Sequence, residues 1–224
     1  MPIHRPIQAE DPALSVVIPT IPANSHEEVV KCLADQTVAD FEVLVVDDAE
    51  LDICEARNAG IERASTPVVA LTDDDCEPPE SWVEAIESAF MAEDSLVLLE
   101  GPIRGGRTYD GTRKYVGCNL AFDREAVQSV GGFRSDYAGW RDDTEFGWRV
   151  ERDVEGTCRY DERMLMRHPD RTRADIDAKT EKRLQAEYPQ RYEEIIEPDG
   201  VLARVNDWLW RRGFWDAVDR IRYG

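Results

Sequence analysis

Short apolar runs alternate with helix-like patterns over the first hundred residues. The runs are rich in Val and Leu, as in strands buried on both faces, and cover residues 14–19, 41–48, 67–74 and 96–101. The segments between them repeat apolar side chains at helical spacing and cover residues 25–36, 51–64 and 79–93. Ser25 and Glu28 have the spacing of a capping box at the start of the first helix. This order predicts a doubly wound β-α-β-α-β-α-β half with a parallel sheet.

The pattern is looser from residue 101 onward. Residues 115–133 predict a strand, a short helix that begins at Arg124 and a Gly-Gly stop. A further helix is expected to begin within residues 142–153, and the chain after residue 176 is mostly helical by pattern. We therefore expect an α/β protein with four parts. They are an N-terminal tail (1–12), a first half (13–100), a mixed second half of the same domain (101–170) and a helical C-terminal extension (171–224).

Charge is distributed unevenly along the 224 residues. Residues 1–100 carry 23 acidic and 4 basic side chains, which accounts for −19 of the net charge of −20. Such a field repels nucleic acid, so a DNA or RNA partner is not expected. Only four of the 27 basic residues are Lys. Acidic excess with few lysines is typical of proteins from salt-loving organisms, where salt screens the self-repulsion, and predicts an origin in a halophilic archaeon.

The cysteines and the apolar runs bear on the location of the chain. The five cysteines are scattered, no Cys-x-x-Cys pair occurs, and isolated reduced thiols are expected. No stretch approaches 18 consecutive apolar residues, and the first residues lack the pattern of a secretion signal. These features predict a cytoplasmic protein.

Polar residues follow three of the predicted strands where each strand ends. The first strand ends at Pro19-Thr20, the second at Asp47-Asp48 and the third at Asp73-Asp74-Asp75. The carboxyl ends of parallel strands meet at one edge of a sheet, where ligands bind. A divalent cation held by one or two carboxylates and completed by substrate phosphates fits this arrangement. The alternative is that residues 73–75 are only an acidic start to the next helix.

These residues also carry a resemblance to a known family. "SVVIPT", "VLVVDDAE", "ICEARNAGIERASTPVVALTDDDCEPPESW", "GCNLAFDREAVQSVGGF" and "RDDTEFGWR" occur in this order. Together they resemble a family 2 glycosyltransferase of the GT-A fold over about residues 14–170. The first half would then bind the nucleotide-sugar, and residues 101–170 would hold the acceptor and catalytic side. "DDAELD" departs from the Asp-Asp-Gly-Ser that such enzymes often carry after the second strand.

The resemblance implies roles for the strand-end residues. The base and ribose of a UDP- or GDP-linked donor would contact Pro19, Thr20, Asp47 and Asp48, with Arg57 near the base and phosphates and Asp74 also on the donor side. Asp73 and Asp75 would be the acids of the Asp-x-Asp motif. Mn²⁺ or Mg²⁺ would be bound by Asp75, Asp73 and His168. An ordinary loop histidine is the alternative for His168.

A second acidic cluster lies in "WRDDTEFGWR". The resemblance makes Asp143 the general base that takes a proton from the acceptor hydroxyl, with Asp142 beside it, in a single displacement that inverts the anomeric carbon. Trp140, Trp148 and Arg149 are the expected acceptor-binding residues. The alternatives are that the two acids only cap a helix and that the tryptophans belong to the core.

The last 24 residues predict a further contact. Trp208, Trp210 and Trp215 accompany arginines on an amphipathic pattern, as in an interfacial membrane helix. This would place a peripheral enzyme at the inner face of a membrane, with a glycan or a polyprenyl phosphate as acceptor. Packing on the sheet or a dimer contact is the alternative. For the whole chain, a nucleotidyltransferase and a non-catalytic nucleotide-sugar binder stay open, although no Gly-rich phosphate loop follows the first strand.

Overall fold

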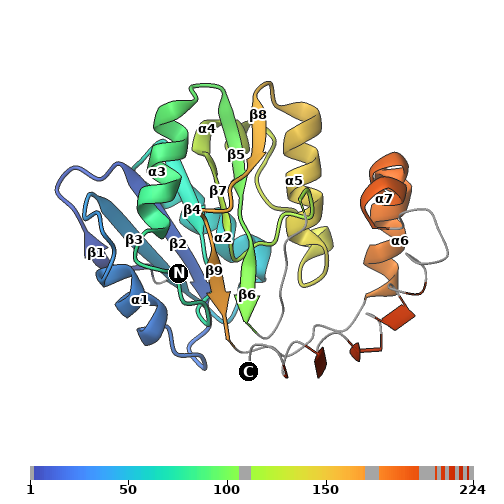
Figure 1. Cartoon of the computed structure of the whole chain (residues 1–224), viewed down its shortest axis with the longest axis horizontal. Helices are drawn as coiled ribbons and strands as arrows, with labels where there is room; N and C mark the ends of the chain where they lie inside the picture. Colours follow the sequence, from blue (N-terminus) through green and yellow to red (C-terminus); the bar gives the residue numbers. More distant parts are fainter. Residues whose placement is uncertain are drawn as a thin grey trace.

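A seven-stranded sheet forms the centre of the molecule in the computed structural model (Figure 1). The structure describes residues 3–105, 112–169 and 177–196, together with residues 205, 208–209, 212–214, 217–218 and 221. The strand order is β1-β3-β2-β4-β7-β5-β8, and β6 pairs with β9 in a separate two-stranded sheet. The strands are β1 (Ile3–Gln8), β2 (Leu14–Thr20), β3 (Phe41–Asp47), β4 (Val68–Leu71), β5 (Leu96–Glu100), β6 (Ile103–Gly105), β7 (Leu120–Asp123), β8 (Thr157–Tyr160) and β9 (Met166–His168).

Five of the seven strands of the sheet (β2, β3, β4, β5 and β8) run in the same direction, which agrees with the predicted mostly parallel sheet. Strand β2 pairs in parallel with both β3 and β4, and β5 pairs in parallel with β8. Strand β7 lies antiparallel between β4 and β5, and β1 lies antiparallel on the outer edge of β3. The carboxyl ends of β2, β3 and β4 therefore meet at one edge of the sheet.

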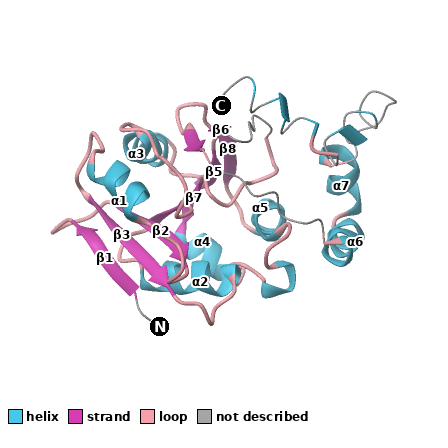
Figure 2. Ribbon diagram, turned by 90° about the horizontal axis from the view of Figure 1, so that it is seen from below, coloured by secondary structure: helices cyan, strands magenta, loops and turns pink. Residues whose placement is uncertain are grey.

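Helices cover both faces of the sheet (Figure 2). They are α1 (Glu27–Ala34), α2 (Ile53–Arg63), α3 (Trp82–Ala92), α4 (Arg124–Ser129), α5 (Asp142–Asp153), α6 (Ala178–Glu187) and α7 (Pro189–Ile195). On β2, Val16 packs into the core that α1 and α3 cover, whereas Val17 packs into the core that α2, α4 and α5 cover. Burial of both faces explains why β2 and β3 are continuous apolar runs.

The C-terminal extension packs beside α5. Leu184 on α6 and Tyr188, which follows it, belong to the same core as α5, and the Tyr188 ring lies edge-on to Trp148 with ring centres 5.7 Å apart. Beyond residue 196, the described residues Trp208 and Phe214 are about half exposed, at 52% and 47%. Trp210 and Trp215 lie outside the described residues. Of the described helices, none has the length and apolar character to span a bilayer.

Two local expectations differ from the structure. Residues 1–12 are not only a tail, because β1 closes the outer edge of β3, which would otherwise leave a row of unpaired backbone groups. The capping box is absent at Ser25, since α1 begins after His26 without a side-chain cap. The reciprocal box occurs instead at α2, where Asp52 and Glu55 each accept a backbone N–H from the other.

Candidate active site

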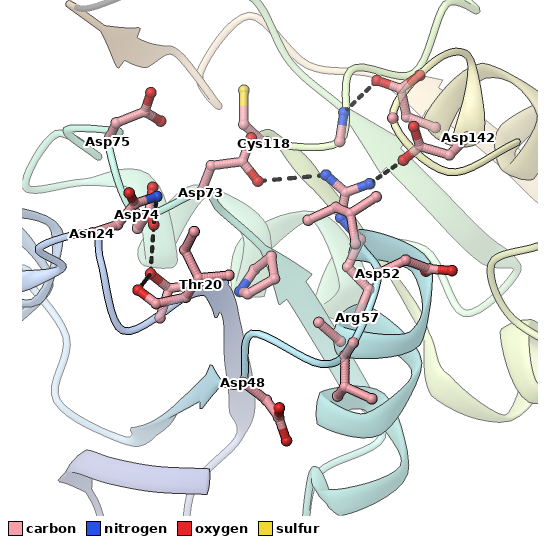
Figure 3. Close-up of a pocket in the computed structure, with 18 of the residues that line it drawn as sticks. Thr20, Asn24, Asp48, Asp52, Arg57, Asp73, Asp74, Asp75, Cys118 and Asp142 are labelled. Carbon is pink, nitrogen blue, oxygen red and sulfur yellow. Dashed lines mark hydrogen bonds and ion pairs between the residues drawn. The ribbon is translucent and has the colours of Figure 1, made fainter. Parts of the chain in front are cut away.

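A cavity of about 550 Å³ opens at the carboxyl ends of β2, β3 and β4 (Figure 3). This volume suits a small-molecule ligand. Ten of the residues that the sequence singled out line it: Pro19, Thr20, Asp48, Arg57, Asp73, Asp74, Asp75, Asp142, Asp143 and His168. The two acidic clusters, about 70 residues apart in sequence, thus face a single space.

Residues 73–75 divide their carboxylates between different partners. The Asp74 carboxylate accepts hydrogen bonds from the Thr20 hydroxyl at 2.5 Å and from the Asn24 amide at 3.0 Å. These bonds fix the loop after β4 against the end of β2. They also leave the carboxylates of Asp73 and Asp75 directed at other groups.

Asp73, Asp75 and His168 form a group that fits a divalent cation. One ligand atom from each lies within 4.8 Å of the others. His168 is the last residue of β9, its Nε2 lies 3.5 Å from Asp75 Oδ1, and its Nδ1 is buried without a hydrogen-bond partner. Partial desolvation, with Asp73 and Asp74 nearby, raises the pKa of Asp75 although His168 opposes the shift. Carboxylates in such a repulsive arrangement favour a bound cation.

Arg57 joins the two acidic clusters. Its Nη1 donates to Asp142 Oδ2 at 2.5 Å, and its Nη2 donates to Asp73 Oδ1 at 3.4 Å. The guanidinium is buried, lies 5.2 Å from the centre of the Phe133 ring, and packs so closely on Gly117 that a Cβ there would meet it at 2.4 Å. Arg57 is therefore held as a fixed positive charge between the carboxylates.

Asp143 lies in the first turn of α5 with both carboxylate oxygens bonded to the backbone. Oδ2 accepts the Gly117 N–H at 2.9 Å, and Oδ1 accepts the Thr144 N–H at 2.7 Å. Burial raises the pKa of Asp143 above the ordinary range, and burial raises that of Asp142 to about 6 in spite of Arg57. An aspartate with a raised pKa is a better proton acceptor near neutral pH than an ordinary one.

The turn before α5 is held by the C-terminal extension. Arg141 has φ 67°, a left-handed conformation that is strained for a residue with a side chain. Its guanidinium donates two hydrogen bonds to the Glu181 carboxylate on α6, at 3.0 and 3.1 Å. The Trp140 indole and the Tyr192 hydroxyl donate to the same carboxylate. Helix α6 thus fixes the backbone that presents Asp142 and Asp143.

The expected acceptor residues do not line the cavity, and two of them need correction. Trp148 is 1% exposed, and its indole donates to the Arg113 carbonyl, so it belongs to the core. Arg149 is also buried, paired with Glu145 at 2.9 Å and bonded to backbone carbonyls. Both sit on the inner side of α5, where helical spacing turns them away from Asp143. Trp140 is half-buried against Glu181 rather than in the cavity.

Asp47 also lies outside the cavity lining. It is the last residue of β3, paired in register with Thr20, whereas Asp48, which follows the strand, lines the cavity. Sequence reasoning missed Asn24, Asp52 and Gly117, which do line the cavity. The Asp-x-x-Glu spacing at Asp52 carried a usable signal, whereas nothing local marks the Gly117 N–H as a partner of Asp143.

The same architecture occurs in solved glycosyltransferase structures. S. aureus TarS 1–349 in complex with UDP-GlcNAc superposes with a TM-score of 0.62 at 14% identity, over 81% of this chain and 72% of that one. S. aureus TarS 1–349 superposes with a TM-score of 0.56 at 13% identity, over 89% and 79%. At these identities the likeness shows the fold, which is the predicted GT-A fold.

The middle of the chain also matches a family model. Residues 51–155 match the model of glycosyl transferase family 2. They include Arg57, the triplet 73–75 and the pair Asp142-Asp143. No curated protein matches the chain significantly. Residues 51–155 thus resemble family 2 glycosyltransferases, and together with the GT-A fold this likeness supports glycosyltransferase activity.

Proposed function

We propose that the chain transfers a sugar from a nucleoside-diphosphate sugar to an acceptor, with a divalent cation and with inversion at the anomeric carbon. The observation that carries this is the single cavity in which Asp73, Asp75 and His168 face Asp142 and Asp143. The similar TarS structures contain UDP-GlcNAc and UDP, which favours a UDP-linked donor here.

The donor is assigned to the β2–β4 side of the cavity. Thr20 and Asp48 lie at the ends of neighbouring parallel strands, where the nucleoside of a ligand binds in open α/β sheets. Asp73, Asp75 and His168 would hold Mn²⁺ or Mg²⁺, which suits their oxygen and imidazole ligands. When bound, this cation neutralises charge on the departing diphosphate. Arg57 adds a fixed positive charge on the same side.

Asp143 is assigned as the general base. The acceptor oxygen forms a bond to the anomeric carbon, the bond from that carbon to the diphosphate oxygen breaks, and the acceptor proton passes to the Asp143 carboxylate. The Gly117 and Thr144 N–H groups orient this carboxylate. One displacement from the face opposite the diphosphate inverts the configuration. The Asp142 charge paired with Arg57 holds the base side and the donor side together.

The acceptor is proposed to be a glycan or a polyprenyl phosphate, with peripheral membrane contact. The described residues Val205, Trp208, Phe214 and Ile221 are exposed large apolar side chains in the C-terminal segment. Sedimentation of the full chain with anionic liposomes should be lost after replacement of Trp208 and Phe214 by Ser, with folding unchanged. A full chain that ignores liposomes at every salt concentration would remove the membrane contact but not the transferase.

A panel of nucleotide sugars tests the function itself. Hydrolysis or transfer would be followed with and without Mn²⁺ by release of the nucleoside diphosphate. A UDP-sugar should raise the melting temperature only with the cation present, and slow release of UDP should follow. Binding without any turnover would indicate a non-catalytic binder. Release of pyrophosphate in place of a nucleoside diphosphate would indicate a nucleotidyltransferase.

A further inference from the structure

Two buried cysteines meet at the wall of the cavity beside the proposed cation site. Cys76 is 1% exposed and Cys118 is 2% exposed, and all five cysteines are outside disulfides. Their sulfur atoms and one nitrogen of His168 lie within 4.8 Å of one another. We propose that Cys76, Cys118 and His168 form a site for a thiophilic cation such as Zn²⁺, distinct from the Asp73–Asp75 pair but sharing its histidine.

Backbone contacts bring the three residues together. An isolated bridge between Glu77 and Arg167, with N–H groups donated in both directions at 2.7 and 3.3 Å, places Cys76 next to His168. The turn that holds Cys118 is fixed by Asn119, whose amide donates to the Pro102 and Met164 carbonyls at 3.0 and 2.6 Å. Three separate segments of the chain therefore bring these side chains together. Two thiols buried only as core residues would not require such an arrangement.

The donor set selects a soft cation. Zinc prefers thiolate and imidazole ligands in tetrahedral geometry, and three protein ligands leave the fourth position open. With Zn–S bonds of ~2.3 Å, two sulfurs on one ion stand ~3.8 Å apart, and because the sulfurs lie within 4.8 Å of each other they must approach by at most about 1 Å. Binding forms two Zn–S bonds and one Zn–N bond and releases two thiol protons to solvent. Burial among apolar side chains such as Trp82 and Met166 protects the thiolates from water.

The shared histidine makes the two cation sites compete. A neutral imidazole has one nitrogen with a free lone pair, while the other nitrogen carries a proton and cannot bind a metal. Zn²⁺ on the cysteines therefore removes His168 from Asp73 and Asp75. Only this competition rests on the proposed function, because the thiolate site itself needs no donor or acceptor.

Cobalt spectroscopy tests the site directly. Under reducing conditions, one equivalent of Co²⁺ added to the full chain should give a thiolate-to-cobalt charge-transfer band that Zn²⁺ abolishes. Cys76→Ala and Cys118→Ala should lose the band, whereas Cys158→Ser and Asp75→Asn should keep it. A folded wild-type chain without the band, or a band that survives in both alanine variants, would overturn the proposal.

Alkylation of the wild-type chain tests the site without relying on variants that could fail to fold. In the wild-type chain, Zn²⁺ should slow alkylation of Cys76 and Cys118 at least about tenfold and leave Cys32 unaffected. Even the loss of a residue that only supports a metal ligand changes metal affinity by about this factor. Equal protection of all three, or none, contradicts the site. For the competition, Zn²⁺ should displace bound Mn²⁺ from wild type but not from Cys118→Ala. Displacement from both the wild type and Cys118→Ala would contradict the proposal that the two sites share His168. Absence of any Mn²⁺ binding would count against the proposed function alone.

Discussion

The Arg57 guanidinium bonds Asp142 at 2.5 Å inside the protein, 85 residues away along the chain. Both side chains are buried, at 6% and 11% exposure. The same guanidinium reaches Asp73, so one cation joins the loop after β4 to the first turn of α5. The loop after β4 and the first turn of α5 are therefore held at a fixed separation by one buried guanidinium.

Loss of this link should destabilise the fold. Arg57→Leu leaves Asp142 buried and unpaired, which costs ~3–5 kcal/mol of unfolding free energy. In the double variant with Asp142→Asn, the loss should be less than the sum of the two single losses. Urea unfolding at neutral pH measures all four proteins. Additivity within about 0.5 kcal/mol would show that the two residues act independently.

The pH profile of transfer should be displaced upward on its acid side. Burial raises the pKa of Asp143, so the base becomes protonated, and transfer falls, at a higher pH than the ~3.9 of an ordinary aspartate. Measurement of kcat/KM from pH 4 to pH 8 checks this. An acid limb at or below about pH 4 would contradict the assignment of Asp143.

The pH dependence of the free energy of unfolding should reflect the raised pKa of Asp142. Its folded pKa of about 6 exceeds the unfolded value, so the folded chain holds this proton more tightly. The contribution to stability is complete below the unfolded pKa and is lost as pH rises through about 6. The stability of wild type relative to Asp142→Asn should therefore fall between pH 4 and pH 6.5. A rise over that interval would mean that the Arg57 pair outweighs burial.

Helix α6 should matter for catalysis as well as for packing. Glu181→Ala removes the acceptor of Arg141, Trp140 and Tyr192, and should cost ~2 kcal/mol or more. The strained Arg141 turn should relax, which lowers kcat with little effect on donor affinity. The exposed Glu155→Ala is the matched control. Unchanged kcat in a destabilised Glu181→Ala would limit α6 to a packing role.

Salt should stabilise the protein. Residues 1–100 carry −19, and screening relieves the repulsion among their carboxylates. The melting temperature should rise as NaCl increases from 0.1 M to about 2 M, where the screening length falls below ~3 Å. A melting temperature that does not change with NaCl would contradict the expectation and the predicted adaptation to salt.

Local patterns predicted the elements of the first half and the strand-end residues well. Residues 14–19, 41–48, 67–74 and 96–101 became β2 to β5, because buried parallel strands are continuous apolar runs of that length. Residues 142–153 became α5, and the glycines after α4 both take positive φ, at 83° and 67°. In each case the information lies within a few consecutive residues.

What the sequence could not show depends on partners far along the chain. The insertion of β7 between β4 and β5, and the pairing of β1 with β3, are choices among strand edges that no local pattern encodes. The direction in which Trp148 points is set by which side of α5 meets the core. The sequence placed Arg57 near the phosphates of a ligand. Its bond to Asp142 could not be predicted, because only the folded chain brings these two residues together.

Asp143→Asn tests the central claim most directly, with Asp153→Asn on the same helix as the matched control. Donor affinity with Mn²⁺ and the rate of sugar transfer would be measured on both folded variants. Asp143→Asn should bind the donor as wild type does and transfer it ~10²–10⁴ times more slowly, the usual effect of a lost general base, while Asp153→Asn transfers normally. Transfer by Asp143→Asn at the wild-type rate would contradict the account.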